Sequence, residues 1–141
     1  MPVDSLRYVE SSALLAALLE HEPTVLAALR VAGRLVTSAL TVAEASRGIV
    51  RARVSGRLTA DQEAAATRGL RTLQRRCAVV GVTDVVLTRA GRRFPVEPVR
   101  TLDAVHLATI EMLADSPPLM TVVTRDDRVS NNARAMGYAL A

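Results

Sequence analysis

The chain has 141 residues, half of them hydrophobic, which is enough for one domain with a substantial core and too few for two ordinary domains. Its 18 basic residues are all arginine and outnumber the 14 acidic ones, and this charge of +4 favours a nucleic-acid partner, although arginine richness is also typical of a GC-rich genome. A single cysteine, Cys77, excludes an intramolecular disulfide and a cysteine-based zinc site, and the apolar run 13–19 is too short to cross a bilayer, so we expect one cytoplasmic domain over residues 1–141.

Short apolar runs alternate with segments of helical spacing along the chain. Strands are predicted over 6–9 and 119–123, with weaker candidates at 35–37, 78–80 and 138–140. Helices are predicted over 12–19, 24–32, 39–54, 60–76, 83–91, 102–114 and 128–136, and their expected caps are Ser11 or Ser12, Thr59 with Gln62, Thr83, Thr101 and Asp126. This alternation predicts a three-layer α/β/α sandwich around a central, mostly parallel sheet.

Acidic residues stand where predicted strands end or helices begin. Glu10 follows the first strand in YVESSALL, Asp126 follows LMTVV within TRDDR, and Asp103 opens the helix of RTLDAVHLA. Glu44 lies inside the helix of TSALTVAEASRGI, among apolar neighbours. Because ligands of open parallel sheets gather beyond the carboxyl ends of the strands, we expect these carboxylates to converge.

Carboxylates that converge repel one another, by roughly 4 kcal/mol for a pair about 4 Å apart at an effective dielectric constant near 20. A cation between them would offset this repulsion. A set of oxygen ligands without clustered histidine or cysteine favours a hard cation, Mg²⁺ or Mn²⁺, which keeps water in its shell and can present it as a nucleophile.

Each acid also has a purely structural explanation. Asp103 could answer the helix dipole, Glu44 could close a capping box with Thr41, Asp126 could cap a helix, and Glu10 could pair with an arginine. The joint occurrence favours the metal site, because Glu10 and Glu44 interrupt otherwise apolar faces.

At these four places the sequence resembles the PIN-domain ribonucleases, and specifically the VapC-type toxins of bacterial toxin-antitoxin pairs. YVESSALL is similar to the opening strand, acid and helix of that family, TVAEASRG to its second acidic motif, and RTLDAVHLA and VTRDDRV to its third and fourth. The last two are the most specific, and the order, spacing and total length agree over essentially the whole chain.

This resemblance implies a PIN-like fold with a five-stranded parallel sheet, a homodimer, and a metal-dependent endoribonuclease that cuts structured RNA, often tRNA or rRNA, and inhibits translation. It implies a cognate VapB-type antitoxin whose segment occupies the active-site groove. The implied catalytic and metal-binding acids are Glu10, Glu44, Asp103 and Asp126, and the implied supporting hydroxyls are Ser11 and Thr124.

One position departs from the family pattern. The family usually has aspartate where this chain has Glu10, and the extra methylene moves the carboxylate outward from the geometry that Mg²⁺ prefers. We therefore expect that either the strand ends slightly further back or the ion lies elsewhere, with a lower activity or a preference for Mn²⁺. Asp127, beside Asp126, could supply a further oxygen or, as we favour, cap the helix.

Two arginines follow Glu44 on one helical face and are our candidates for RNA phosphate contacts: Arg47 and Arg51. A salt bridge to Glu44 or a solvated face is the alternative explanation for them. His106, one turn beyond Asp103, is expected to be a buried or dimer-facing residue rather than a ligand. With only three aromatic residues, the chain favours recognition of RNA shape and backbone over base stacking.

Other functions fit the sequence less well. Receiver domains and aspartyl phosphatases also gather acids beyond strand ends, but they need a lysine, which this chain lacks, and a strand-end aspartate where it has Glu10. The sequence contains neither a GxGxxG motif nor a Walker-type loop, so nothing in it indicates a nucleotide cofactor. The remaining alternative is a catalytically weak or inactive PIN-like domain that binds RNA or a partner protein, for which Glu10 is the best support.

Overall fold

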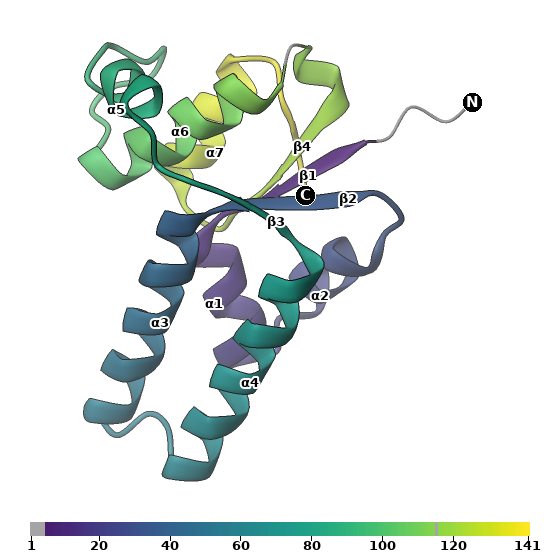
Figure 1. Ribbon diagram of the computed structural model, residues 1–141, viewed down its shortest axis with the longest axis vertical. Helices are drawn as coiled ribbons and strands as arrows, with labels where there is room; N and C mark the ends of the chain where they lie inside the picture. The colour runs from purple at the N-terminus through teal and green to yellow at the C-terminus, as the bar shows by residue number, and fades with distance from the viewer. Residues whose placement is uncertain (1–4, 115) are drawn as a thin grey trace.

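A five-stranded sheet forms the centre of the computed structural model, which describes residues 5–114 and 116–141 (Figure 1). The strand order is β3-β2-β1-β4-β5, and every neighbouring pair is parallel. The strands are β1 (Leu6–Val9), β2 (Arg34–Ser38), β3 (Ala78–Val80), β4 (Met120–Val123) and β5 (Ala139–Leu140). All three weaker strand candidates are therefore present, and the expected parallel sheet is confirmed.

Helices cover both faces of this sheet, with α1 to α4 on one side and α5 to α7 on the other (Figure 1). They are α1 (Ser11–Glu20), α2 (Pro23–Arg30), α3 (Ala39–Val54), α4 (Ala60–Arg76), α5 (Asp84–Ala90), α6 (Thr101–Leu113) and α7 (Asp127–Ala135), and a 3-10 turn, η1 (Pro117–Leu119), precedes β4. In the described part of the chain no single helix is long and apolar enough to span a membrane, and α1 with α2 meets that criterion only as a pair bent by 114°.

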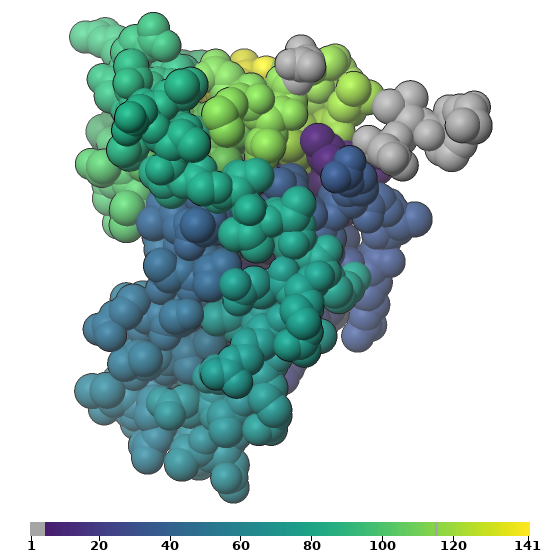
Figure 2. Space-filling view, viewed as in Figure 1, coloured from purple at the N-terminus to yellow at the C-terminus, as the bar shows by residue number. Residues whose placement is uncertain are grey.

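Two hydrophobic cores lie on opposite faces of the sheet because successive strand side chains point in opposite directions. Tyr8 and Val122 pack in the core that contains α6 and α7. Val9 and Val123, the next residues along the same strands, pack in the core that contains α1 to α4. Strands buried on both faces read as continuous apolar runs, which is why β1 and β4 are the clearest strands in the sequence. Figure 2 shows α3 and α4 as a blue-to-teal lobe that extends well away from the sheet.

The strand order reverses direction between β1 and β4. From β1 the chain moves outward to β2 and β3, and it then crosses over through α5 and α6 to enter β4 on the other side of β1. The carboxyl ends of β1 and β4 lie side by side, since the backbone N–H of Glu10 donates to the carbonyl of Val123 at 3.0 Å. Such a reversal leaves a crevice beyond the strand ends, and this is where open α/β sheets bind ligands.

Helix caps agree with the sequence in most places and differ in two. Thr59 and Gln62 form the expected capping box, and Thr83 and Asp126 cap α5 and α7. The cap of α1, however, is Glu10 rather than a serine, because β1 passes into α1 with only this residue between them. Helix α6 begins one residue early, at Thr101, so its N-cap position falls on Arg100, whose side chain makes no capping hydrogen bond.

The loop that leads into α6 is fixed by hydrogen bonds, most of them partly buried. Asn132 accepts from the Val96 backbone N–H and donates to the Val96 carbonyl, both at 2.8 Å. Glu97 accepts from the backbone N–H groups of Phe94 (3.0 Å) and Val99 (2.9 Å). This loop therefore delivers the first turn of α6 to the crevice in a defined position.

Candidate functional site

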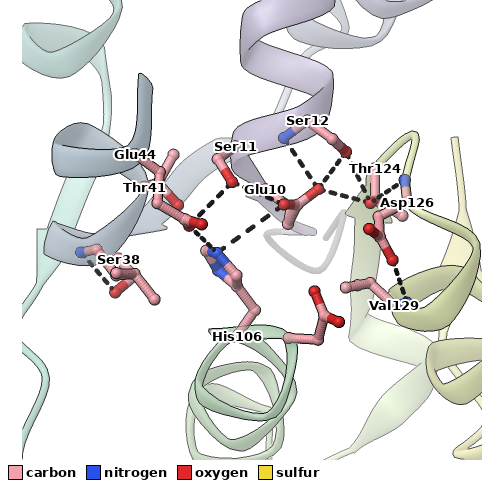
Figure 3. A network of polar contacts seen from close by, with 12 residues as sticks. Glu10, Ser11, Ser12, Ser38, Thr41, Glu44, His106, Thr124, Asp126 and Val129 are labelled. Atoms are coloured by element: carbon pink, nitrogen blue, oxygen red, sulfur yellow. Dashed lines mark hydrogen bonds and ion pairs between the residues drawn. The ribbon is translucent and has the colours of Figure 1, made fainter. Parts of the chain in front are cut away.

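Glu10 is the centre of a polar network beyond the ends of β1 and β4 (Figure 3). Its side chain is buried, with only 4% of the residue exposed. One carboxylate oxygen, Oε2, accepts from the Ser12 backbone N–H (3.1 Å), from the Ser12 hydroxyl and from the Thr124 hydroxyl (2.7 Å). The other oxygen, Oε1, accepts from the Ser11 hydroxyl at 2.8 Å. The buried charge of Glu10 is thus met by hydrogen-bond donors and not by an arginine.

The direction of two of these hydroxyl protons is set by the backbone. The Arg125 N–H donates to Ser12 Oγ at 2.8 Å, and the Asp126 N–H donates to Thr124 Oγ1 at 3.0 Å. Each hydroxyl oxygen accepts from the backbone with one lone pair. An ionised carboxylate can only accept, so the hydroxyl proton is donated to Glu10. The turn after β4 therefore helps to orient the donors that hold this carboxylate.

Glu44 comes to the same place from α3, and its side chain is one quarter exposed. Ser11 Oγ lies 2.9 Å from Glu44 Oε1 and 2.8 Å from Glu10 Oε1. A hydroxyl has one proton, so Ser11 satisfies only one of the two carboxylates at a time. The alternative explanation of Glu44, a capping box with Thr41, is excluded, because Ser38 caps α3 and Glu44 lies more than a turn inside the helix.

His106 lies behind the two glutamates and is buried, with 1% exposed. Its Nε2 is 2.6 Å from Glu44 Oε1 and 3.9 Å from Glu10 Oε1, and its Nδ1 is 2.8 Å from the Tyr8 hydroxyl. Burial raises the pKa of Tyr8, so the phenol keeps its proton. Burial also acts to raise the pKa of Glu44, but the hydrogen bond and charge of His106, with smaller contributions from Ser11 and Arg51, leave it below its usual range.

Asp103 and Asp126 share one arginine. Arg100 Nε is 3.3 Å from Asp103 Oδ2, and Arg100 Nη2 is 3.6 Å from Asp126 Oδ2. The second oxygen of Asp126, Oδ1, accepts from the backbone N–H groups of Arg128 (2.8 Å) and Val129 (3.1 Å) and so caps α7. The helix-cap explanation for Asp126 is therefore correct, and it still leaves Oδ2 available to a cation.

The donor set on the glutamate side fits a divalent cation. One ligand atom each from Glu10, Glu44 and His106 lies within 4.8 Å of the others, and these residues are buried or partly buried. Two carboxylate oxygens share one hydroxyl proton there, so the local charge is strongly negative. Added positive charge would be stabilised at this point.

A groove of about 500 Å³ opens beside the acids, between α3 and the start of α6. Its charged lining residues are Glu44, Arg47, Arg51, Arg100 and Asp103. Both arginines that follow Glu44 in the sequence thus border the same space as two of the acids. A phosphodiester backbone in this groove would meet arginines and carboxylates together.

The structure brings the predicted residues together in two groups. The first contains Glu10, Ser11, Glu44 and Thr124, and the second contains Asp103 and Asp126. Ser12, His106 and Arg100 also belong to the site and were not predicted there. His106 is buried as expected, and its contact with Glu44 had one sequence signal, since it lies on the same face as Asp103 in an otherwise apolar helix.

Comparisons with known proteins agree on one family. The family model for the PIN domain matches residues 7–135. The ribonuclease VapC35 of Mycobacterium tuberculosis is 31% identical over 109 residues, which cover 76% of this chain and 71% of that protein.

Solved structures share the fold at low sequence identity. The VapC20 toxin of Mycobacterium tuberculosis, described as cleaving the sarcin-ricin loop, superposes with a TM-score of 0.66 at 15% identity, over 94% of this chain and 96% of that one. The VapBC2 complex of Rickettsia felis, bound to a DNA fragment from its promoter, gives a TM-score of 0.65 at 12% identity, over 96% and 97% of the two chains.

Proposed function

The chain belongs to the PIN-domain family as a relative of the VapC ribonucleases, and we propose that it is a metal-dependent endoribonuclease toxin that cuts structured RNA, either tRNA or rRNA. The observation that carries this proposal is the convergence of Glu10 and Glu44 on one hydroxyl proton, beside an arginine-lined groove. Such a site attracts a cation and a polyanion together.

Mg²⁺ or Mn²⁺ would be held by Glu10, Glu44, Asp103 and Asp126. When bound, the cation lowers the pKa of a water and neutralises charge that builds on the phosphate oxygens. His106 adds an imidazole nitrogen to the donor set, and nitrogen ligands suit Mn²⁺ better than Mg²⁺. Its Tyr8 contact is compatible with either tautomer, because a phenol hydroxyl both donates and accepts.

The remaining roles fall to the residues around the acids. Glu44 or Asp103 orients the attacking water, and Ser11 and Thr124 hold the glutamate carboxylates in place. Arg47 and Arg51 bind RNA phosphates along the groove. In-line attack by this water would leave a 5′-phosphate and a 3′-hydroxyl without a covalent enzyme intermediate.

A VapB-type antitoxin would be the partner that inhibits this activity in the cytoplasm. Support comes from the family and from the VapBC complexes with the same fold. A segment of the antitoxin would lie in the active-site groove, and the toxin would act as a homodimer. Co-expression with its cognate VapB-type antitoxin should restore growth that the toxin alone stops.

One observation favours a second candidate, a weakly active or inactive PIN-like domain that binds RNA or a partner. Three protein donors already occupy Glu10 Oε2, so only Oε1 faces Glu44. The longer side chain folds back as a helix cap instead of extending into the crevice. A glutamate held in this way is a poorer ligand than the aspartate usual at this position.

Cleavage of total cellular RNA by purified, antitoxin-free protein tests both candidates. The assay is run in EDTA, Mg²⁺ and Mn²⁺ with wild type, Asp103→Asn and Glu10→Asp. Metal-dependent cutting at discrete sites, lost in Asp103→Asn, is the result expected of a nuclease. If only Glu10→Asp cuts, the natural protein is the binding domain of the second candidate, and if no variant cuts, the nuclease proposal is wrong.

A further inference from the structure

Within residues 5–114 and 116–141, Arg100 is the one basic residue that contacts two of the proposed metal-binding acids, and it was not among the predicted site residues. Its side chain is 66% exposed, whereas that of Asp103 is 9% exposed. Exposed ion pairs are weak and exchange easily. The fixed partners in this arrangement are therefore the carboxylates, and the mobile partner is the guanidinium.

The two contacts fall on the oxygens that a cation would need. Asp126 uses Oδ1 to cap α7, so Oδ2 is the oxygen left for an ion, and Oδ2 is the one that Arg100 faces at 3.6 Å. The Asp103 oxygen nearest to Arg100 is likewise Oδ2, at 3.3 Å. A divalent cation that binds Asp126 must share Oδ2 with Arg100 or displace it, and its charge beside Asp103 would repel the guanidinium as well.

A displaced Arg100 would remain in a useful place. It lines the groove that also contains Arg47 and Arg51, and it stands at the α6 side while those two stand on α3. A guanidinium binds phosphate through two parallel hydrogen bonds, a geometry that lysine cannot reproduce. The groove would then present arginines on both walls to an RNA backbone.

We infer that Arg100 is a substrate-binding residue that competes with the divalent cation for Asp103 and Asp126 and that turns to an RNA phosphate once the cation holds them. This inference rests on the proposed function, because it assigns the cation and the RNA to the same site. It also implies that the cation and RNA bind cooperatively. The cation favours Arg100 turned toward the RNA phosphate, and RNA favours Arg100 turned away from the two aspartates.

Mn²⁺ titrations without RNA, followed by electron paramagnetic resonance, test the competition. Arg100→Ala should bind Mn²⁺ about three- to tenfold more tightly than wild type, as expected from the loss of weak ion pairs. Arg51→Ala is the matched control: it removes the same charge from the same groove and contacts neither aspartate, and because the charge of Arg51 also acts on Glu44, it measures how much of the effect comes from general electrostatics. Arg100→Lys keeps the charge but loses the guanidinium that contacts both aspartates. Its Mn²⁺ affinity should lie between those of wild type and Arg100→Ala.

A second experiment measures RNA cleavage at saturating Mn²⁺. In Arg100→Ala the KM for RNA should rise about tenfold while kcat changes less, so one variant binds the cation better and the RNA worse. A merely structural residue would not move the two affinities in opposite directions.

Two results would overturn the inference while leaving the nuclease intact: Mn²⁺ affinity in Arg100→Ala no tighter than in Arg51→Ala, or an unchanged KM. Absence of cleavage in every variant, including wild type, would instead count against the proposed function.

Discussion

The two halves of the acidic site are built differently. In the enclosed half, Glu10 and Glu44 are held by hydroxyls, a backbone N–H and an imidazole, all buried or partly buried. In the open half, Asp103 and Asp126 face a single exposed guanidinium. In the enclosed half the partners of the carboxylates are buried or partly buried, whereas in the open half the shared partner is an exposed side chain that a cation could replace. We conclude that the enclosed half sets the geometry and that the open half makes the site responsive to its ligands.

The strongest test of this difference is Asp103→Asn. We expect RNA cleavage to fall by about 10²- to 10³-fold, because a charge that stabilises the reacting phosphate through the cation is lost. The melting temperature should stay close to that of wild type, since the partner of the buried Asp103 carboxylate is the 66% exposed Arg100 side chain, and such an ion pair contributes little to stability. A large loss of thermal stability would show that the open half is structural after all.

A second test removes the hydrogen bond between Tyr8 and His106, next to the enclosed half. Tyr8→Phe leaves His106 Nδ1 without its partner, and we expect Mn²⁺ affinity to fall by about 10- to 100-fold, as is usual when the residue that orients a ligand is lost. Isothermal titration calorimetry measures this directly. Tyr138→Phe, at another buried tyrosine, is the matched control and should leave Mn²⁺ affinity unchanged.

Thr124 offers a test of stability instead of binding. Thr124→Val keeps the shape but removes the hydroxyl that donates to Glu10 and accepts from the Asp126 N–H. We expect the free energy of unfolding in urea to fall by about 1–3 kcal/mol, because buried groups lose their partners. Thr124→Ser, which keeps the hydroxyl, should lose less than the valine variant, and equal losses would contradict the assigned role.

The smallest expected effect concerns a partly exposed acid outside both halves. Glu22 caps α2, and its backbone hydrogen bonds from Val25 and Thr24, with the contact to Arg125, lower its pKa to about 2. A lowered folded-state pKa means that the stabilisation is present above pH 4.5 and is lost as the pH falls toward 2. Glu22→Gln should therefore melt below wild type at pH 7 and together with it near pH 2, as circular dichroism can follow.

The sequence predicted the strand-end acids because their positions follow from the fold. One strand ends just before Glu10 and another ends shortly before Asp126. These two strands are neighbours at the point where the strand order of the parallel sheet reverses, so the acids that follow them come close together. Arg100 could not be found in this way, since its position depends on a loop fixed by Asn132, far away in the chain. Nor could the serine cap of α1 be rejected from sequence, because only the direct passage from β1 into α1 places Glu10 at the cap.

The hydrogen bond between Thr124 and Glu10 joins residues 114 positions apart, so the site is assembled from nearly the whole chain. During translation β1, β2 and β3 leave the ribosome long before β4, and domains tend to fold from the N-terminus as they are made. A nascent chain that ends before β4 has Glu10 and Glu44 but neither Asp126 nor the hydroxyl of Thr124. The site is therefore complete only once β4 and the turn after it have been made, and we expect products that terminate before β4 to lack nuclease activity.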